Sequence, residues 1–155
     1  MIPSIDDRLA SVVRALTDIV LPAMPPEASL AIEQTQLSIG QLQIIGAQLP
    51  AAPAYEQEEA DDARALALAL LEQGDGGVRT TEALTALRCA IDGKGTTRDA
   101  RVAIHEAIDR LVRAVSADGA DAFRAALGKT IVEMQTVRSM KDRRWFAAMG
   151  FDAGH

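Results

Sequence analysis

The sequence predicts an all-α protein, an up-and-down helical bundle of four long helices plus one or two short ones. Three observations predict this fold. Apolar residues recur at a spacing near 3.6, no segment alternates with a period of two for long, and alanine and leucine are abundant while aromatic residues make up 3% of the chain. At 155 residues the chain has the size of one domain, so we expect residues 1–155 to form a single helical-bundle domain.

Proline residues delimit the first two predicted helices. The first helix begins at Ser4, a good N-cap residue, and is expected to stop at Pro22. The Pro-Pro pair at 25–26 fixes the entry to the second helix, residues 27–49, because proline is tolerated in a first helical turn. Pro50 then prevents this helix from continuing.

Glycine and threonine residues delimit the next two predicted helices. The third helix, residues 54–73, ends at the glycine-rich stretch 74–77, which is the most flexible linker that the composition predicts. A short fourth helix follows, capped by Thr80 or Thr81 and closed by Gly93.

The last two predicted helices are long. Thr96 or Thr97 caps the fifth helix, whose apolar residues step by four, three and four, the seam spacing of bundle packing. These residues are Ile104, Ile108, Leu111 and Val115. The sixth helix begins after residues 116–119 and is expected to run to about Met149.

Charge is distributed unequally along the chain. Residues 1–75 carry 12 acidic and 3 basic residues, whereas residues 76–155 carry 10 acidic and 13 basic residues. This division allows the acidic half to dock against the basic half, and it could also steer self-association or a partner. No nucleic acid partner is predicted, because the net charge is −6 and the basic residues are not interleaved with aromatic residues.

Cysteine content and the length of apolar runs indicate the cellular compartment of the protein. Cys89 is the only cysteine, so no internal disulfide can form, and nothing near the N-terminus has the order of a secretory signal. The longest apolar runs are shorter and more polar than the stretch of about 20 apolar residues that a membrane span needs. We therefore expect a cytoplasmic protein with no membrane association.

The most specific pattern is a glutamine heptad in the segment 34–55, which contains no charged residue. The amides recur every seven residues beside an apolar row with the same spacing, and seven residues return nearly to the same helix face. The amide row is Gln34, Gln41 and Gln48, and the apolar row is Leu30, Leu37 and Ile44. Such a helix is expected to be surrounded by protein.

Two interpretations of this pattern are open. Buried amides need hydrogen-bond partners, so the glutamines either bond to adjacent helices or a second subunit, or form the polar wall of a ligand cavity inside the bundle. Glutamine supplies no acid, base or nucleophile, so both interpretations describe binding and not catalysis.

Basic and aromatic residues gather near the C-terminus. Arginine and tryptophan dominate the energetics of many interfaces, and this stretch contains Arg144, Trp145, Phe146 and Phe151. It is interpreted as a docking surface for another subunit, as a cap on the bundle's own end, or as a membrane-surface attachment. The predicted ligand or interface residues are therefore these four together with Gln34, Leu37, Gln41, Ile44 and Gln48.

Two other groups of titratable residues are weaker candidates. Glu58 and Asp62 lie four apart and could offer oxygen ligands to a divalent cation, but the acidic stretch 56–62 also suits the positive end of a helix dipole, and we interpret it as a solvated helix start. His105 lacks a full set of metal-ligand neighbours and is interpreted as a boundary histidine that contacts Asp109 or Arg101. No metal and no cofactor are predicted.

No pattern combines a nucleophile with a base, so an enzyme is less favoured than a non-catalytic module. The leading hypothesis is a helical bundle that mediates assembly, as a homodimer or as an accessory subunit to a protein partner. The alternative is a bundle that binds a small, largely apolar ligand against the glutamine wall. A third hypothesis is catalysis by His105 with a carboxylate from the acidic stretch 56–62. Cys89 is interpreted as a semi-buried small residue without a base beside it.

Overall fold

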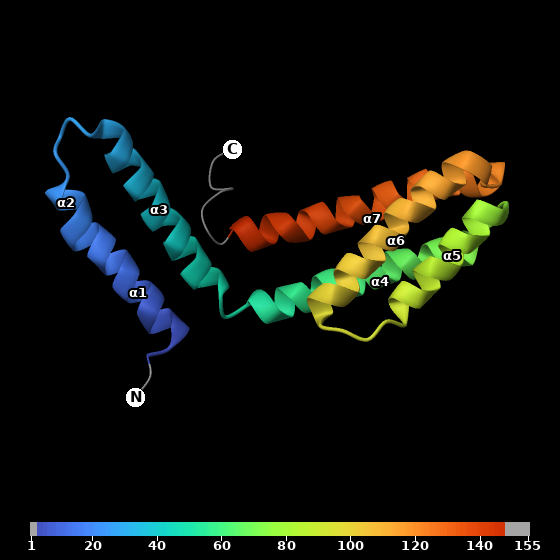
Figure 1. Cartoon of the computed structure of the whole chain (residues 1–155), viewed down its shortest axis with the longest axis horizontal. Coiled ribbons are helices and arrows are strands. Elements are labelled where there is room, and N and C mark those ends of the chain that lie inside the picture. The colour runs from blue at the N-terminus through green and yellow to red at the C-terminus, as the bar shows by residue number, and fades with distance from the viewer. Residues whose placement is uncertain (1–2, 148–155) are drawn as a thin grey trace. The chain divides into compact units, whose positions relative to one another are not determined.

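The computed structural model describes residues 3–147, and within them it contains helices and no strands, which confirms the all-α prediction (Figure 1). The predicted positions of Met149 and Phe151 lie outside the described residues. The chain divides into two compact units, residues 1–53 and 54–155, and each is described by itself. That the two units make one domain stays a prediction.

The first unit is a helical hairpin. Its first arm consists of α1 (Ile5–Ala15), a π-helical segment (Leu16–Val20) and α2 (Leu21–Ala23), and its second arm is α3 (Ser29–Gln48). Ser4 caps the first arm, as predicted, through a capping box with Asp7. The arm continues through Pro22 and ends at Ala23, one residue beyond the predicted end. A π-helical turn directly before a proline changes the hydrogen-bond spacing where the proline ring would otherwise crowd a carbonyl group.

The covered side of α3 is not the predicted one. Ile39 is buried, with 9% of its surface exposed, and Gly46 lies so close to α1 that an added Cβ would be 3.1 Å from Leu9 Cδ2. These two positions are spaced by seven residues, as are the residues of the predicted apolar row. At about 100° per residue, Leu37 lies about 160° around the helix from Ile39, so the predicted apolar row faces away from α1.

The second unit is a four-helix bundle of α4 (Ala52–Gln73), α5 (Val78–Ile91), α6 (Thr97–Asp118) and α7 (Asp121–Ala147), joined by short connections (Figure 1). Leucine, isoleucine, alanine and valine residues from α4, α5 and α6 form its core together with Phe123 of α7. The predicted seam of the fifth helix is confirmed, since all four of its residues are buried. The core includes Leu66, Leu70, Leu87, Ile91, Ile104, Ile108, Leu111, Val115 and Leu127.

The two short connections at one end of this bundle are bonded to each other. The amide N–H of Gly77 donates to the carbonyl oxygen of Asp118 at 2.8 Å, and the N–H of Ala120 donates to the carbonyl oxygen of Asp75 at 3.1 Å. An added Cβ on Gly76 would lie 2.9 Å from Gly119 Cα, so this contact needs glycine. The prediction that residues 74–77 form a flexible linker is therefore wrong, because glycine here permits close packing of two backbones.

Asp118 also caps the N-terminus of α5 from a distance along the chain. Its carboxylate accepts hydrogen bonds from the amide N–H groups of Arg79 and Thr80, at 2.8 and 2.9 Å, and from Thr80 Oγ1 at 2.6 Å. Because α5 begins at Val78 with Gly77 at the N-cap, the prediction that Thr80 or Thr81 caps this helix is wrong, and Thr80 is instead fully buried within its first turn. The side-chain hydrogen bond from Thr80, followed by the two backbone hydrogen bonds, lowers the pKa of Asp118 despite some burial.

No helix within residues 3–147 combines the length and the apolar character needed to cross a membrane.

Candidate functional site

An ion-pair network joins the acidic start of α4 to α7. Arg138 of α7 lies at its centre, with 13% of its side chain exposed. Its guanidinium contacts Glu59 at 3.1 Å, Asp62 at 3.4 Å and Asp142 at 2.6 Å. A largely buried guanidinium with three carboxylates around it holds a fixed orientation, because its planar donors match carboxylate geometry.

Two further helical positions complete the network. Arg101 of α6 pairs with the second oxygen of Glu59. Lys141 of α7 contacts Glu58 at 3.0 Å and Asp62 at 2.7 Å. Hydrogen bonds to Asp62 and then to Glu58 raise the pKa of Lys141 above its ordinary value. The predicted attraction between the acidic and basic halves is therefore confirmed for α4 against α6 and α7.

The interpretation of the acidic stretch as a solvated helix start is wrong for Glu58, Glu59 and Asp62, which are ion-paired across helices. The lysine ammonium lies between Glu58 and Asp62, the two residues that the sequence offered as cation ligands. Among residues 3–147, no group of three or more histidine, cysteine, aspartate and glutamate side chains is arranged to hold a metal ion.

The aromatic end of α7 packs on the start of α4. The Trp145 ring stacks on the Tyr55 ring, with centroids 4.2 Å apart and planes 17° from parallel, and the Arg138 guanidinium lies 4.7 Å from the Tyr55 centroid. Tyr55 donates its hydroxyl to Asp142 at 2.5 Å. Burial, followed by this hydrogen bond, raises the pKa of Tyr55 to about 12. This geometry agrees with the interpretation of the stretch as a cap on the bundle's own end.

The predicted C-terminal site residues have different surroundings. Trp145 is half-buried against Tyr55, Arg144 is exposed beside a shallow pocket that it shares with Lys141, and Phe146 is 47% exposed. Phe151 lies outside the described residues. The network residues Glu59, Arg138 and Asp142 were not among the predicted sites, although charges of opposite sign at helical spacing on the third and sixth helices were a usable signal.

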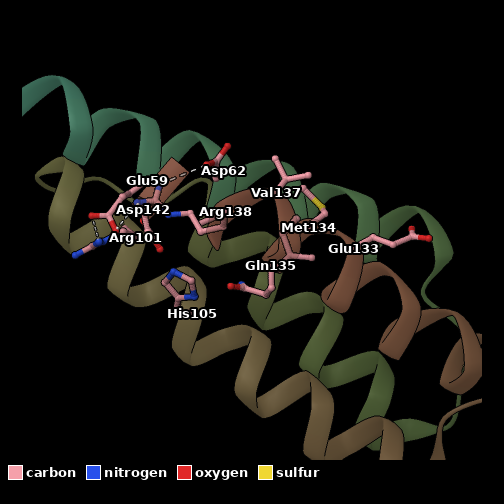
Figure 2. A pocket seen from close by; sticks show the side chains of 12 residues that line it. Glu59, Asp62, Arg101, His105, Glu133, Met134, Gln135, Val137, Arg138 and Asp142 are labelled. Atoms are coloured by element: carbon pink, nitrogen blue, oxygen red, sulfur yellow. Dashed lines mark hydrogen bonds and ion pairs between the residues drawn. The ribbon is translucent and has the colours of Figure 1, made fainter. Parts of the chain in front are cut away.

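A cavity of about 430 Å³ opens between α6 and α7, with α4 as its floor (Figure 2). Figure 1 shows that α6 and α7 meet at the tight turn between them and diverge from there. Buried Ala63 and Leu66 of α4 and the half-buried Met134 of α7 supply its apolar surface. Glu59, Arg101, His105, Gln135, Arg138 and Asp142 are among its polar lining residues.

His105 and Gln135 stand on the two sides of this cavity, one from α6 and one from α7 (Figure 2). Both are exposed, and neither side chain makes a hydrogen bond to another residue in the described part of the chain. No hydrogen bond or ion pair among the described residues joins the His105 side chain to Asp109 or Arg101, although His105 and Arg101 line the same cavity, so the predicted contact stays a prediction. His105 and Glu59 line one cavity, but both oxygens of Glu59 are held by arginines, so this carboxylate is not available as a base for His105.

The glutamine heptad and its apolar row lie at the surface of α3. Gln34 and Gln41 are exposed, and Gln48 is half-buried, with its Nε2 atom buried and unpaired among the described residues. Leu37 is 55% exposed and Ile44 is half-buried. No helix of the hairpin covers this row, and the interpretation that the amides bond to adjacent helices or to a second subunit stays a prediction.

Two further observations concern reactive or binding groups. Cys89 is exposed, so its interpretation as a semi-buried residue is wrong. The residues that line the cavity come from α4, α6 and α7, and the glutamines that were predicted as a ligand wall lie on α3.

Comparisons with protein-family models, with curated proteins and with solved structures find no match to this chain.

Proposed function

We propose that this protein is a non-catalytic assembly module and that the helical hairpin of residues 1–53 self-associates through α3. One observation carries the proposal. Helix α3 is apolar on two opposite sides, and only the side with Ile39 is covered within the hairpin. An apolar stripe on a helix is normally packed against another structural element.

The apolar row on the uncovered side is the proposed contact surface. Leu30 is 69% exposed and Leu37 is 55% exposed, and a Cβ added to Gly40 on the neighbouring stripe of the helix would meet no atom within 4 Å. Leucines repeated every seven residues form the seam of helix pairs, and a glycine beside the seam lets a second backbone approach closely. We call Leu30, Leu37 and Ile44 the α3 ridge.

The other arm of the hairpin is also incompletely covered. Ile5, Val12 and Ile19 recur every seven residues on α1 and its π-helical continuation, with 68%, 48% and 68% of their surfaces exposed. A groove of about 450 Å³ runs between α1 and α3, lined by Leu9, Val13, Leu42 and Gly46 among others. Two helices alone cannot bury their apolar faces, so this hairpin needs further helices to complete a bundle.

A second copy of the chain fits this surface better than a charged partner. The stretch from Gln34 to Tyr55 carries no charge, so two identical ridges meet without like-charge repulsion. An amide both donates and accepts, so Gln34 and Gln41 can bond to the same residues of a second copy, which identical charged groups cannot do. A two-fold axis makes such a contact self-complementary.

The size of the α3 ridge sets the strength of the contact. The ridge runs along a helix of 20 residues, about 30 Å, and is about one helix diameter, about 10 Å, wide. Two copies paired along it would bury on the order of 600 Å², the size of a weak, reversible contact. We therefore expect self-association at high micromolar concentration.

Sedimentation velocity of the full chain over a range of micromolar concentrations tests this proposal. We expect the wild type to dimerise and Leu37→Glu to remain monomeric, because a carboxylate in the middle of the ridge would be buried without a partner. Val132→Glu, at a position 65% exposed on α7, is the matched control and should dimerise like the wild type. A wild type that stays monomeric, or a Val132→Glu variant that dissociates as fully as Leu37→Glu, contradicts the proposal.

A further inference from the structure

The cavity between α6 and α7 is independent of the α3 ridge and has the properties of a binding site. Its volume of about 430 Å³ falls within the range of small-molecule pockets, about 300–1,000 Å³. Its apolar floor is made of core residues, Ala63 and Leu66, which are 3% and 4% exposed. A rigid apolar floor with a few polar groups at the sides is the usual design of a pocket for a small organic molecule.

Hydrogen-bonding capacity that the protein does not use indicates the chemistry of the ligand. Each carboxylate in the lining already has a basic partner: Glu59 has two arginines, Asp62 and Asp142 share Arg138, and Glu133 faces Lys129 at 3.8 Å. The acceptors in the lining are therefore largely occupied. A ligand that offers only hydrogen-bond donors would have to compete with these ion pairs.

The unused groups are mostly donors. Arg101 makes one ion pair, to Glu59, so most of its five N–H donors are not engaged by protein atoms that the structure describes. His105 and Gln135 face the same cavity, and their side chains make no hydrogen bonds within residues 3–147. Arg101 is also held in place by Glu59, since its side chain is only 25% exposed, so its free donors keep their direction.

We infer that this cavity binds a small, largely apolar molecule that carries a hydrogen-bond acceptor, a carboxylate or carbonyl group, received by Arg101, His105 and Gln135. The apolar body of the molecule lies on Ala63, Leu66 and Met134. A carboxylate gains more than a neutral carbonyl, because hydrogen bonds to a guanidinium are stronger when the acceptor is charged.

Three molecules of similar shape and different head group test this inference on the full chain. Phenylbutyrate offers a carboxylate, phenylbutyramide a neutral carbonyl, and phenylbutylamine a cationic donor, and each can be titrated by calorimetry and by amide chemical shifts. We expect the carboxylate to bind most tightly, the amide more weakly and the amine least. Shifts should be largest for residues around His105 and Gln135.

A pair of arginine variants on α6 provides the control. Arg101→Met removes the proposed donor but leaves Glu59 paired with Arg138, so the fold should persist. Arg98→Met removes the same charge from the same helix, where Arg98 pairs with Glu56 and does not line the cavity. We expect Arg101→Met to weaken phenylbutyrate binding about tenfold and Arg98→Met to leave it within about twofold of wild type.

Three results would overturn the inference: no binding of any of the three molecules at millimolar concentration, equal or tighter binding of the amine, or equal effects of the two arginine variants. If Arg101→Met unfolds, the double variant His105→Ala and Gln135→Ala replaces it. These two residues are exposed and without protein hydrogen bonds among the described residues, so their loss should lower affinity without lowering stability.

Discussion

The hairpin of residues 1–53 and the bundle of residues 54–155 use similar residues in opposite ways. In the described part of the chain, Ile39 is the only buried apolar residue of the hairpin, whereas the bundle has a continuous core from Ala63 to Leu127. Both regions have leucine and isoleucine at helical spacing. The bundle has four helices to cover these side chains and the hairpin by itself has two, so within each unit the difference follows from the number of helices and not from composition.

The largest effect that should distinguish the two regions comes from matched leucine truncations. Leu111 is fully buried in the bundle, so Leu111→Ala should lower the free energy of unfolding by about 3 kcal/mol through lost burial and a cavity. Leu37→Ala should cost less than about 1 kcal/mol at dilute concentration, where the ridge is uncovered. Denaturant unfolding at several protein concentrations measures both.

The concentration dependence of these truncations sharpens the comparison. A dimer stabilises the folded state by mass action, so the cost of Leu37→Ala should rise with protein concentration while that of Leu111→Ala should not. Equal costs for both variants at every concentration would show that the two regions do not differ in the way described.

A smaller effect should come from the glycines. An added Cβ on Gly119 would lie 2.7 Å from the carbonyl oxygen of Val115, so Gly119→Ala should destabilise the bundle by about 2 kcal/mol through displaced backbone. Gly128 lies within α7 with nothing within 4 Å of an added Cβ, so Gly128→Ala should stabilise by about 0.5–1 kcal/mol. Thermal melts of the two variants should shift in opposite directions. A gain in stability for Gly119→Ala would contradict the close packing of the two connections.

The smallest expected effect is the contribution of Asp118 to the stability of the bundle, and it depends on pH. The folded-state pKa of Asp118 is lowered below 3.8, so its contribution to stability is fully present above pH 3.8 and is lost as pH falls through the folded value. Asp118→Asn keeps an acceptor oxygen but removes the charge. The variant should therefore be less stable than wild type at pH 7, with a difference that shrinks as the pH falls below 3.8.

Asp121→Asn serves as the control for this pH dependence. Asp121 is 99% exposed at its side chain and lies three residues from Asp118, with a surface ion pair to Arg124 at 3.2 Å. Its replacement should change stability little at either pH. A constant difference between Asp118→Asn and wild type from pH 7 to pH 2 would be inconsistent with the carboxylate cap.

Local signals in the sequence predicted most of the helix boundaries. Thr96 caps α6 through a capping box with Asp99, and α3 ends at Gln48, shortly before Pro50. These signals act over a few residues, so they do not depend on the rest of the fold. The capping of α5 by Asp118 was not predictable in this way, because nearly forty residues separate the two.

The orientation of α3 and the cavity between α6 and α7 were not predicted, for different reasons. Rows at Leu37 and at Ile39 are both apolar and both repeat every seven residues, so periodicity alone cannot choose which faces α1. The cavity exists because α6 and α7 diverge after Gly119, a matter of tertiary geometry that no motif near His105 encodes. The attraction between the acidic residues of α4 and the basic half of the chain was predictable, but the basic residue with which each acid pairs was not.

Cysteine cross-linking at the α3 ridge tests the central claim most directly. In a Cys89→Ser background, Leu37→Cys places a thiol in the middle of the ridge, near the two-fold axis of an antiparallel pair, and Val132→Cys places one on α7. We expect mild oxidation to convert the Leu37→Cys protein rapidly to a covalent dimer while the Val132→Cys protein stays monomeric. Equally slow cross-linking of the two variants would contradict self-association through α3.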